Sequence, residues 1–215
     1  MLVGEKMTHE PVTIVESASI DDGLHLMRER KVHRLPILDS AGRLVGIVSD
    51  SDLLHASPSA ATSLSVFELH YLLSKLTIKS VMSSPVISVG PSTPLEEAAR
   101  VMVDNQIGGV TVVDGGKLVG IVTESDILKI LIDALGARTP GLRVTLEGSD
   151  RKGNLAALTR SIADLGGNIV SLVTSTGEQA GEAMITVKIS EVEEQKLRQA
   201  LTQMPGQRVV DFRSV

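Results

Sequence analysis

The chain has 215 residues, of which 42% are apolar and 22% are charged, and its formal net charge is −5. This length and apolar content are sufficient for one or two packed domains. The sequence contains no Cys and no Trp, and only two Phe and one Tyr. The composition therefore excludes disulfides, thiolate catalysis and zinc-thiolate sites, and it argues against a nucleic-acid partner, which would need a basic face or stacking aromatic residues.

The first ten residues, Met1–Glu10, contain no apolar core of the kind found in secretory signal peptides. No apolar run approaches the roughly 18 residues that a membrane-spanning helix needs. Together with the absence of cysteine, these features predict a cytoplasmic protein that does not enter a membrane.

Two long segments of the chain repeat each other. Each repeat is predicted to form a strand, a helix, a strand, a turn, a strand and a second helix. The corresponding strands and helical faces are Pro11–Val15 with Pro85–Val89, Ile20–Val32 with Leu95–Ile107, Leu35–Leu38 with Val110–Val113, and Leu44–Val48 with Leu118–Val122. The repetition predicts two similar structural units that pack as a pair.

The repeats are separated by a chain break at Ser57-Pro58-Ser59 and by a helical apolar pattern between residues 64 and 76. Phe67 and Tyr71 lie four positions apart on this predicted helix and therefore share one face. We expect this face to pack between the two repeats, and self-association is the alternative.

A third unit begins after Arg138–Gly141. Its predicted elements are a strand Leu142–Glu147, a helix Asn154–Leu165, strands Asn168–Thr174 and Ala183–Ile189, a helix Glu191–Met204 and a strand Val209–Phe212. The order β-α-β-β-α-β is typical of a small ferredoxin-like sandwich. The predicted organisation is a first repeat at 1–56, a linker and helix at 57–77, a second repeat at 78–138 and a third domain at 139–215.

The pattern Gly-Ile-Val-(Ser/Thr)-x-x-Asp occurs twice, ending at Asp52 and at Asp126. Its hydroxyl residue, Ser49 or Thr123, is predicted to lie at a helix N-cap, where outward-facing backbone N–H groups favour an anion such as phosphate. Three positions later, the carboxylate is placed to accept hydrogen bonds from the vicinal hydroxyls of a ribose. The same spacing describes a capping box, in which the carboxylate folds back on its own helix. The repetition favours a nucleotide site, and the capping box remains the alternative.

The sequence resembles a tandem pair of CBS domains, which together form a Bateman module, followed by an ACT domain. The residues that carry the resemblance are the two motifs above, the strands Pro11–Val15 and Pro85–Val89, the segment His33–Pro36, and, for ACT, Leu146–Leu155 with Gly166–Ile169. The implied fold class is α/β (α+β), with two β-α-β-β-α CBS repeats and one β-α-β-β-α-β domain. The order CBS-CBS-ACT is similar to that of acetoin utilisation regulators of the AcuB type.

CBS pairs bind adenosyl ligands such as AMP, ADP, ATP or S-adenosylmethionine in the cleft between the repeats. The resemblance implies ribose binding by Asp52 and Asp126, phosphate binding by Ser49, Thr123, His33 and Arg34, and adenine binding by main-chain groups near Thr13, Ile14, Ile87 and Ser88. Whether Mg²⁺ accompanies a polyphosphate ligand is left open.

The second repeat departs from the first at one place that concerns the ligand. It has Gly108–Thr111 where the first repeat has His33–Pro36, so it lacks the basic pair. We therefore expect two unequal sites. For Arg34, an exposed position at a strand edge is the alternative to a ligand contact.

The ACT resemblance implies an amino-acid effector site in the loop between the first strand and the first helix. The corresponding residues here are Asp150, Gly153 and Asn154, with Asn168 and Ile169 opening the neighbouring strand. Lys152 stands where a proline is common. The alternatives are that the domain only pairs chains, and that Gly153 only provides a turn at the helix entry.

No catalytic or metal site is predicted, because the five His residues show no ligand spacing and no nucleotide-hydrolase, dinucleotide or serine-hydrolase motif is present. The sequence predicts a regulatory protein that senses an adenine nucleotide and forms a homodimer or a larger homo-oligomer. An adaptor that binds no ligand and regulates its partner by contact is the alternative.

Overall fold

The computed structural model describes residues 1–56, 75–177 and 179–215. The chain forms two compact units, Met1–Ile127 and Leu128–Val215. The predicted helix that carries Phe67 and Tyr71 lies largely outside the described residues, and so do both aromatic side chains. None of the described helices is long and apolar enough to cross a membrane.

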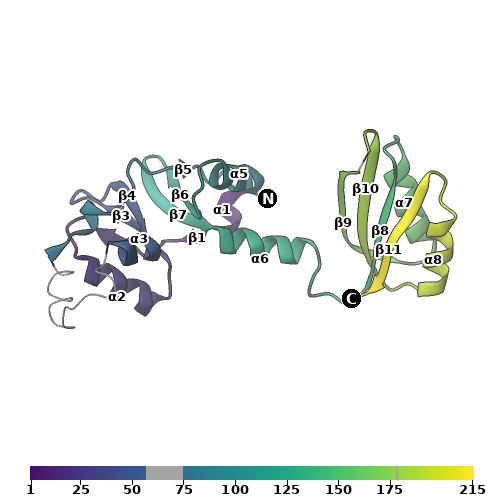
Figure 1. Ribbon diagram of the computed structural model, residues 1–215, viewed down its shortest axis with the longest axis horizontal. Coiled ribbons are helices and arrows are strands. Elements are labelled where there is room, and N and C mark those ends of the chain that lie inside the picture. The colour runs from purple at the N-terminus through teal and green to yellow at the C-terminus, as the bar shows by residue number, and fades with distance from the viewer. Residues whose placement is uncertain (57–74, 178) are drawn as a thin grey trace. The chain divides into compact units, whose positions relative to one another are not determined.

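The N-terminal unit contains the predicted order of elements twice (Figure 1). The first repeat contains β2 (Ile14–Val15), α2 (Ile20–Arg30), β3 (Arg34–Leu38), β4 (Leu44–Ser49) and α3 (Asp50–His55). The second contains β5 (Ser88–Val89), α5 (Leu95–Asp104), β6 (Gly109–Asp114), β7 (Lys117–Thr123) and α6 (Glu124–Ala134). Short elements precede each repeat: α1 (Val3–Lys6) and β1 (Thr8–His9) before the first, and the 3₁₀ turn η1 (Ile78–Ser80) before the second. The division between the two compact units falls within α6.

Helix α2 illustrates how the local sequence sets an element in place. The backbone N–H of Asp22 donates to Ser19 Oγ at 3.1 Å, and the N–H of Ser19 donates to Asp22 Oδ2 at 3.1 Å, which completes a capping box. Its apolar face, Ile20, Leu24 and Met27, is buried in the core of the first repeat because these residues recur at helical spacing.

The leading segment of each repeat pairs with the sheet of the other repeat. Strand β1 joins the second sheet, whose order is β1-β7-β6-β5, with Thr8 opposite Ile121. Conversely, Ser83, which leads into the second repeat, exchanges backbone hydrogen bonds with Ile47 in β4 of the first sheet, ordered β2-β3-β4. The two repeats are therefore interleaved, and residues that follow these crossings lie beside the other repeat.

This interleaving accounts for the glycine that opens each copy of the repeated motif. A Cβ at Gly46 would collide with the side chain of Met82, and a Cβ at Gly120 would collide with that of Met7. Both methionines lie in the crossing segments. The glycine is needed because a methionine from the other repeat packs against the strand at that point.

The structure corrects the predicted correspondence of the first strands by one residue. The residue that is paired across the middle strand with the motif glycine is Ile14 in the first repeat and Val89 in the second. The predicted alignment matches Ile14 with Ser88 instead. The two prolines cause this error, because Pro11 and Pro85 are not equivalent in the structure.

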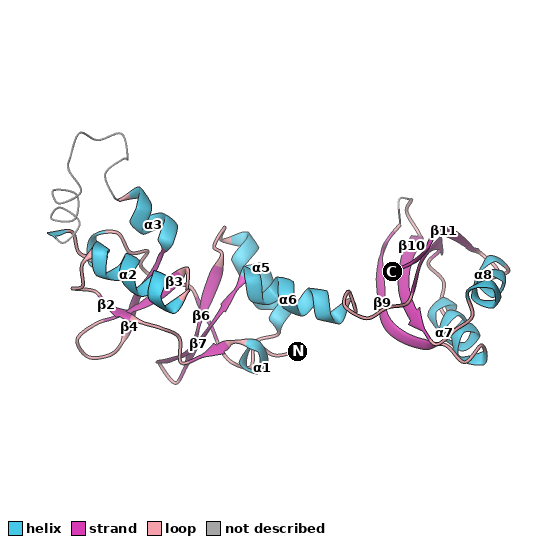
Figure 2. Cartoon of the chain, turned by 90° about the horizontal axis from the view of Figure 1, so that it is seen from below, coloured by secondary structure: helices cyan, strands magenta, loops and turns pink. Residues whose placement is uncertain are grey.

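The C-terminal unit has the predicted order β-α-β-β-α-β. Its elements are β8 (Leu142–Ser149), α7 (Asn154–Asp164), β9 (Asn168–Thr176), β10 (Glu182–Ser190), α8 (Glu194–Thr202) and β11 (Gln207–Ser214). The strands form one antiparallel sheet in the order β11-β8-β10-β9. Figure 2 shows α7 and α8 on the same side of this sheet. The core lies between the sheet and these two helices, and its main residues are Val144, Leu146, Leu158, Ile162, Ile185, Val187, Ile189, Leu197 and Leu201.

Candidate functional site

A cavity of about 380 Å³ lies between the two repeats of the N-terminal unit. One side is formed by the end of β4 and the start of α3, which contribute Ser49 and Asp52. The other side comes from the second repeat, through the segment Pro85–Ile87 and the turn 106–109 that precedes and opens β6. The remaining wall includes Arg34, the first residue of β3. Four of the predicted ligand residues therefore meet in one cavity: Arg34, Ser49, Asp52 and Ile87.

The carboxylate of Asp52 forms a capping box with Ser49. Asp52 Oδ2 accepts hydrogen bonds from the backbone N–H of Ser49 at 2.8 Å and from Ser49 Oγ at 2.7 Å. Ser49 Oγ in turn accepts from the backbone N–H of Asp52 at 3.2 Å. The predicted alternative of a helix cap is thus present. Because these bonds use only Oδ2, capping and a contact from Oδ1 to a sugar hydroxyl are compatible.

The second copy of the motif has the same local geometry. Asp126 Oδ2 accepts from the backbone N–H of Thr123 at 3.0 Å and from Thr123 Oγ1 at 2.7 Å. The two motifs are therefore equivalent at the level of the cap, and a difference between the two sites has to come from their surroundings.

Arg34 supplies such a difference, because its side chain lies against the glycines of the second repeat. A Cβ at Gly108 would lie 2.8 Å from Cζ of Arg34, and a Cβ at Gly109 would lie 3.2 Å from its Cδ. The first contact is too close for any other residue at position 108 unless the arginine moves. The glycines that stand in place of the basic pair in the second repeat leave the space that the Arg34 side chain occupies.

His33 lies apart from Arg34, contrary to the prediction that both would contact phosphate. His33 borders a different hollow, beside α2, and its Nδ1 lies 2.7 Å from Oδ2 of Asp50. The hydrogen bond from His33 holds the pKa of Asp50 below its ordinary value. His33 lies in the bend before β3, whereas Arg34 is the first residue of the strand, so the two side chains leave the chain at different local conformations.

Of the four residues predicted near the adenine, only Ile87 lines this cavity. Ile14 is 9% exposed and belongs to the core of the first repeat, and neither it nor Thr13 lines the cavity. Ser88 instead pairs its Oγ with Thr111 Oγ1 at 2.7 Å. The wall is formed by the three residues before Ser88, which include Pro85 and Val86 as well as the predicted Ile87. Sequence reasoning placed the contact too far along the strand Pro85–Val89 and so missed these two, and it gave no signal for the turn at Gln106.

Two hollows occur in the C-terminal unit, at the end of its sheet where β8 leads into α7. The larger, of about 600 Å³, is bordered by the predicted effector residues Asp150, Gly153 and Asn154. Gly153 has φ = +93° and directly precedes α7, so this turn requires glycine. Asn154 Nδ2 donates to the carbonyl of Ser149 at 2.6 Å, which fixes the loop.

The other two predicted effector residues, Asn168 and Ile169, are far from this loop. They open β9, which is separated from β8 by β10 and is therefore not the neighbouring strand. Asn168 pairs with Ser190 at one end of β10, whereas Ser149, which precedes the loop, pairs with Glu182 at the other end. Within one chain, the five predicted residues do not form a single site.

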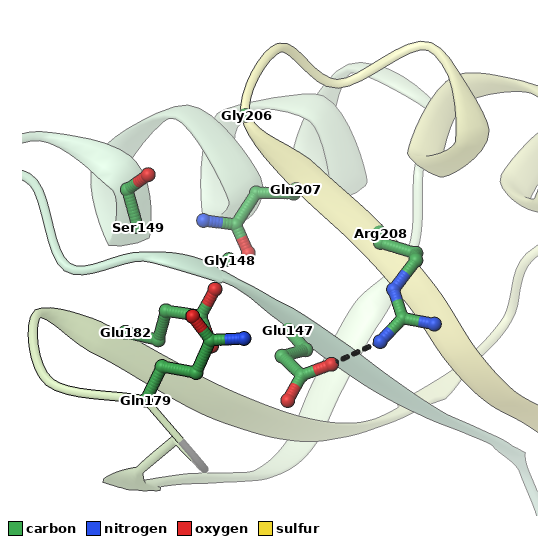
Figure 3. A pocket seen from close by; sticks show the side chains of 8 residues that line it. All are labelled: Glu147, Gly148, Ser149, Gln179, Glu182, Gly206, Gln207 and Arg208. Atoms are coloured by element: carbon green, nitrogen blue, oxygen red, sulfur yellow. Dashed lines mark hydrogen bonds and ion pairs between the residues drawn. The ribbon is translucent and has the colours of Figure 1, made fainter.

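Figure 3 shows the smaller hollow, of about 350 Å³, which shares Ser149, Glu182 and Gln207 with the larger one. Arg208 and Glu147 form an ion pair along one side of it. Oε1 of Gln207 is buried and has no hydrogen-bond partner among the described residues. An unpaired buried amide oxygen is costly, so this side chain is suited to accept a hydrogen bond from a bound group. In the described part of the chain, no three His, Asp or Glu side chains are grouped as metal ligands.

The model of the CBS domain family matches residues 3–59 and 78–133, which together make up more than half of the chain. The chain belongs to the CBS domain family. Each match covers one of the two repeats, so the cavity described above lies between two CBS repeats. The family match ends at residue 133, within α6, and does not include the sheet and helices from β8 to β11.

Relatives of known sequence and structure share the CBS pair. A CBS domain-containing protein of Dictyostelium discoideum is 32% identical over 136 residues, which are 63% of this chain and 94% of the relative. The crystal structure of a candidate acetoin utilization protein (AcuB) of Vibrio cholerae is 34% identical with a TM-score of 0.52, covering 64% of this chain and 95% of that one. The CBS domain pair of protein MJ0100, solved in complex with 5′-methylthioadenosine and S-adenosyl-L-methionine, is 28% identical with a TM-score of 0.51, covering 65% of this chain and 98% of that one.

Other curated relatives are longer than the shared region, and the chain spans 62% of the length of one and 31% of another. This chain therefore shares only the CBS pair with such proteins, and the activity of their other parts is not inferred for it.

Proposed function

We propose that this chain is a regulator that senses an adenosyl ligand in the cleft between its CBS repeats. The observation that carries the proposal is the meeting of Arg34, Ser49 and Asp52 with the Pro85–Ile87 segment of the other repeat around one cavity. Its size, about 380 Å³, lies in the range of small-molecule sites. The complex of MJ0100 with two adenosyl compounds supports the ligand class.

Each wall of the cleft has a distinct role in this proposal. Asp52 accepts a ribose hydroxyl through Oδ1 while Oδ2 keeps the helix cap. Ser49 and the guanidinium of Arg34 bind the phosphate, because Arg presents several donors to an anion. The backbone of Pro85–Ile87 holds the adenine, with Ile87 and Val86 as apolar neighbours.

The second site, at Thr123 and Asp126, is proposed to be weaker for phosphorylated ligands. Arg34 lines the same cavity as Asp52. The position of the second repeat that corresponds to Arg34 is Gly109. A ligand bound at Asp126 therefore has no equivalent guanidinium from the second repeat. Unequal affinities follow, with the Asp52 site preferring anionic nucleotides.

Titration calorimetry on the full chain tests the proposal with AMP, ADP, ATP and S-adenosylmethionine, each with and without Mg²⁺. We expect saturable binding of at least one nucleotide, and loss of the tighter site in Asp52→Ala but not in Asp126→Ala. Arg34→Gln should weaken AMP by about tenfold, the value of a charge-assisted hydrogen bond. It should leave neutral 5′-methylthioadenosine unaffected. No heat with any of these compounds would overturn the proposal.

The alternative function is an adaptor that binds no ligand and regulates a partner by contact. The observation that favours it is that each motif carboxylate, Asp52 or Asp126, accepts hydrogen bonds from the hydroxyl residue three positions earlier, which gives it a structural role without any ligand. If the adaptor hypothesis is right, alanine at either position lowers thermal stability and no adenosyl compound raises it.

We further propose that the C-terminal unit is an ACT domain that pairs chains and senses a small metabolite. The proposal is supported by the order of its elements, the strand order β11-β8-β10-β9 and the hollow beside Asp150, Gly153 and Asn154. Because Asn168 lies at the other end of the sheet, both predicted parts of an effector site come together only between two copies. Sedimentation of the full chain with and without a panel of amino acids tests this; a monomer under all conditions would contradict it.

A role in acetoin or related carbon metabolism is proposed from the likeness to the Vibrio cholerae protein. Growth of a deletion strain on acetoin, compared with growth on glucose, tests it. Equal growth of the deletion and parent strains on acetoin would remove this part of the proposal.

A further inference from the structure

The open face of the C-terminal sheet carries a buried lysine. Along β10, Ile185, Val187 and Ile189 face the helices and fill the core, so the alternating residues Thr186 and Lys188 face the other way. Although it lies on the face away from α7 and α8, Lys188 is only 6% exposed. A charged side chain on an uncovered sheet face would normally reach solvent, so something specific encloses this one.

The enclosing segment is the chain that follows α6. Ser171 Oγ donates to the carbonyl of Leu135 at 3.0 Å, and Lys188 Nζ donates to the carbonyl of Gly136 at 2.8 Å. Position 136 needs glycine, since φ is +61° and a Cβ would collide with Val170. Two consecutive carbonyl groups thus hold the segment against the sheet. A cavity of about 470 Å³ remains between the segment and the sheet.

The charge inside this cavity is not balanced. Within residues 1–56, 75–177 and 179–215, no carboxylate forms an ion pair with Lys188, and its hydrogen bond goes to a neutral carbonyl. Arg143, which also lines the cavity, shares Asp211 with Arg213, so two guanidinium groups face one carboxylate. A buried ammonium without a counter-ion is unfavourable, and it has three donors to satisfy.

The rest of the lining limits what could balance that charge. Leu135 and Val173 are apolar, and Ser171 and Thr186 offer hydroxyl groups. Of the two cationic side chains in the lining, Arg143 is paired with a carboxylate and Lys188 is not, which suits a ligand with a single negative charge. The apolar side chains suit a hydrocarbon tail. A phosphate dianion would need a second unpaired cationic group, and the Arg143 guanidinium in the lining is already paired with Asp211.

We propose that this cavity binds a small organic monocarboxylate, with the carboxylate on the Lys188 ammonium and the aliphatic part against Leu135 and Val173. This site is separate from the CBS cleft and from the hollows beside α7. It therefore does not depend on the proposed nucleotide sensing.

The test is a titration of the full chain with butyrate, with butyramide as an uncharged analogue of the same shape and inorganic phosphate as an anion without a tail. Amide chemical shifts of residues 135–137 and of β10 report binding at this place. We expect saturable shifts with butyrate in the millimolar range and weaker binding of both comparison compounds. No saturable shift with butyrate, or equal binding of butyramide, would overturn the proposal. Tighter binding of phosphate would overturn the carboxylate class.

Three variants locate the effect. Lys188→Met keeps the aliphatic stem and removes the charge, and it should weaken butyrate binding at least about tenfold. Lys117→Met removes an exposed lysine of the N-terminal unit and should leave binding unchanged. Val173→Phe fills the cavity from an exposed position on β9, where 42% of Val173 is accessible, and should abolish binding while Lys188 is intact. Unchanged binding in a folded Lys188→Met or Val173→Phe protein would refute the assignment.

Discussion

The capping box at Asp52 can be separated from ligand binding, because the same box occurs at Ser19 and Asp22, away from the cleft. In both, one carboxylate oxygen accepts from the backbone N–H and from the hydroxyl of the serine three residues earlier: 2.8 and 2.7 Å at Asp52, and 3.1 and 2.6 Å at Asp22. Asp52→Asn and Asp22→Asn therefore disturb nearly identical helix starts. Each removes a negative charge from the first turn of its helix and should lower the free energy of unfolding by about 0.3–1 kcal/mol.

Only Asp52 borders the cleft, so only its substitution should change affinity. A hydrogen bond from a ribose hydroxyl to a carboxylate contributes about 1.5–3 kcal/mol, which corresponds to a roughly 10- to 150-fold rise in the Kd for AMP in D52N. D22N should bind AMP as the unmodified chain does. The assay is calorimetry at a temperature where both variants remain folded by circular dichroism.

Two results would refute this reasoning. Unchanged AMP affinity in D52N would mean that the carboxylate serves only as a cap. An equal loss of affinity in D22N would mean that the stability of the first repeat, and no contact from Asp52, controls binding.

Three further predictions concern stability. Gly148→Ala should destabilise the C-terminal unit strongly, because the added Cβ would collide with the backbone carbonyl of Gly206, which cannot move as a side chain can. Hydrogen exchange of the β8 amides measures this loss of stability, and unchanged protection would contradict the prediction. Gly153→Ala meets no neighbouring atom and should cost only the backbone strain of φ = +93°, about 1–2 kcal/mol by urea unfolding; a neutral effect would show that the turn relaxes. The hydrogen bond from His33 lowers the pKa of Asp50, so the ionised carboxylate stabilises the fold above pH 3.8 and this contribution is lost as the pH falls through the lowered pKa. The difference in unfolding free energy between the unmodified chain and Asp50→Asn should therefore shrink in acid. A constant difference down to strongly acidic pH would contradict this.

Much of the architecture could be read from the sequence. Apolar periodicity located both repeats and all six elements of the C-terminal unit, because burial of one face of a helix or strand is encoded by local spacing. The repeated motif identified Ser49 and Asp52 as a strand-to-helix junction for the same reason. Strands β9 and β11 extend beyond their predicted ends, since pairing with a neighbouring strand continues into polar residues that carry no apolar signal.

What the sequence could not determine was which parts of the two repeats meet. The short segments at Thr8 and Ser83 cross to the opposite sheets, and a pairing of so few residues depends on long-range packing that local spacing does not encode. That exchange brings Pro85–Ile87 to the cleft. It also places Arg34 of the first repeat against Gly108 and Gly109, which stand where the first repeat has its basic pair.

The sequence by itself therefore determined the elements, their duplication and the position of the repeated motif at two strand-to-helix junctions. Only the tertiary structure decided that Arg34 faces the cleft while His33 pairs with Asp50, and that β10 separates Asn168 from the loop at Gly153. The physical reason is common to these cases. The direction of a side chain and the order of strands in a sheet are set by contacts between residues distant in the chain, and the composition of each segment leaves them undetermined.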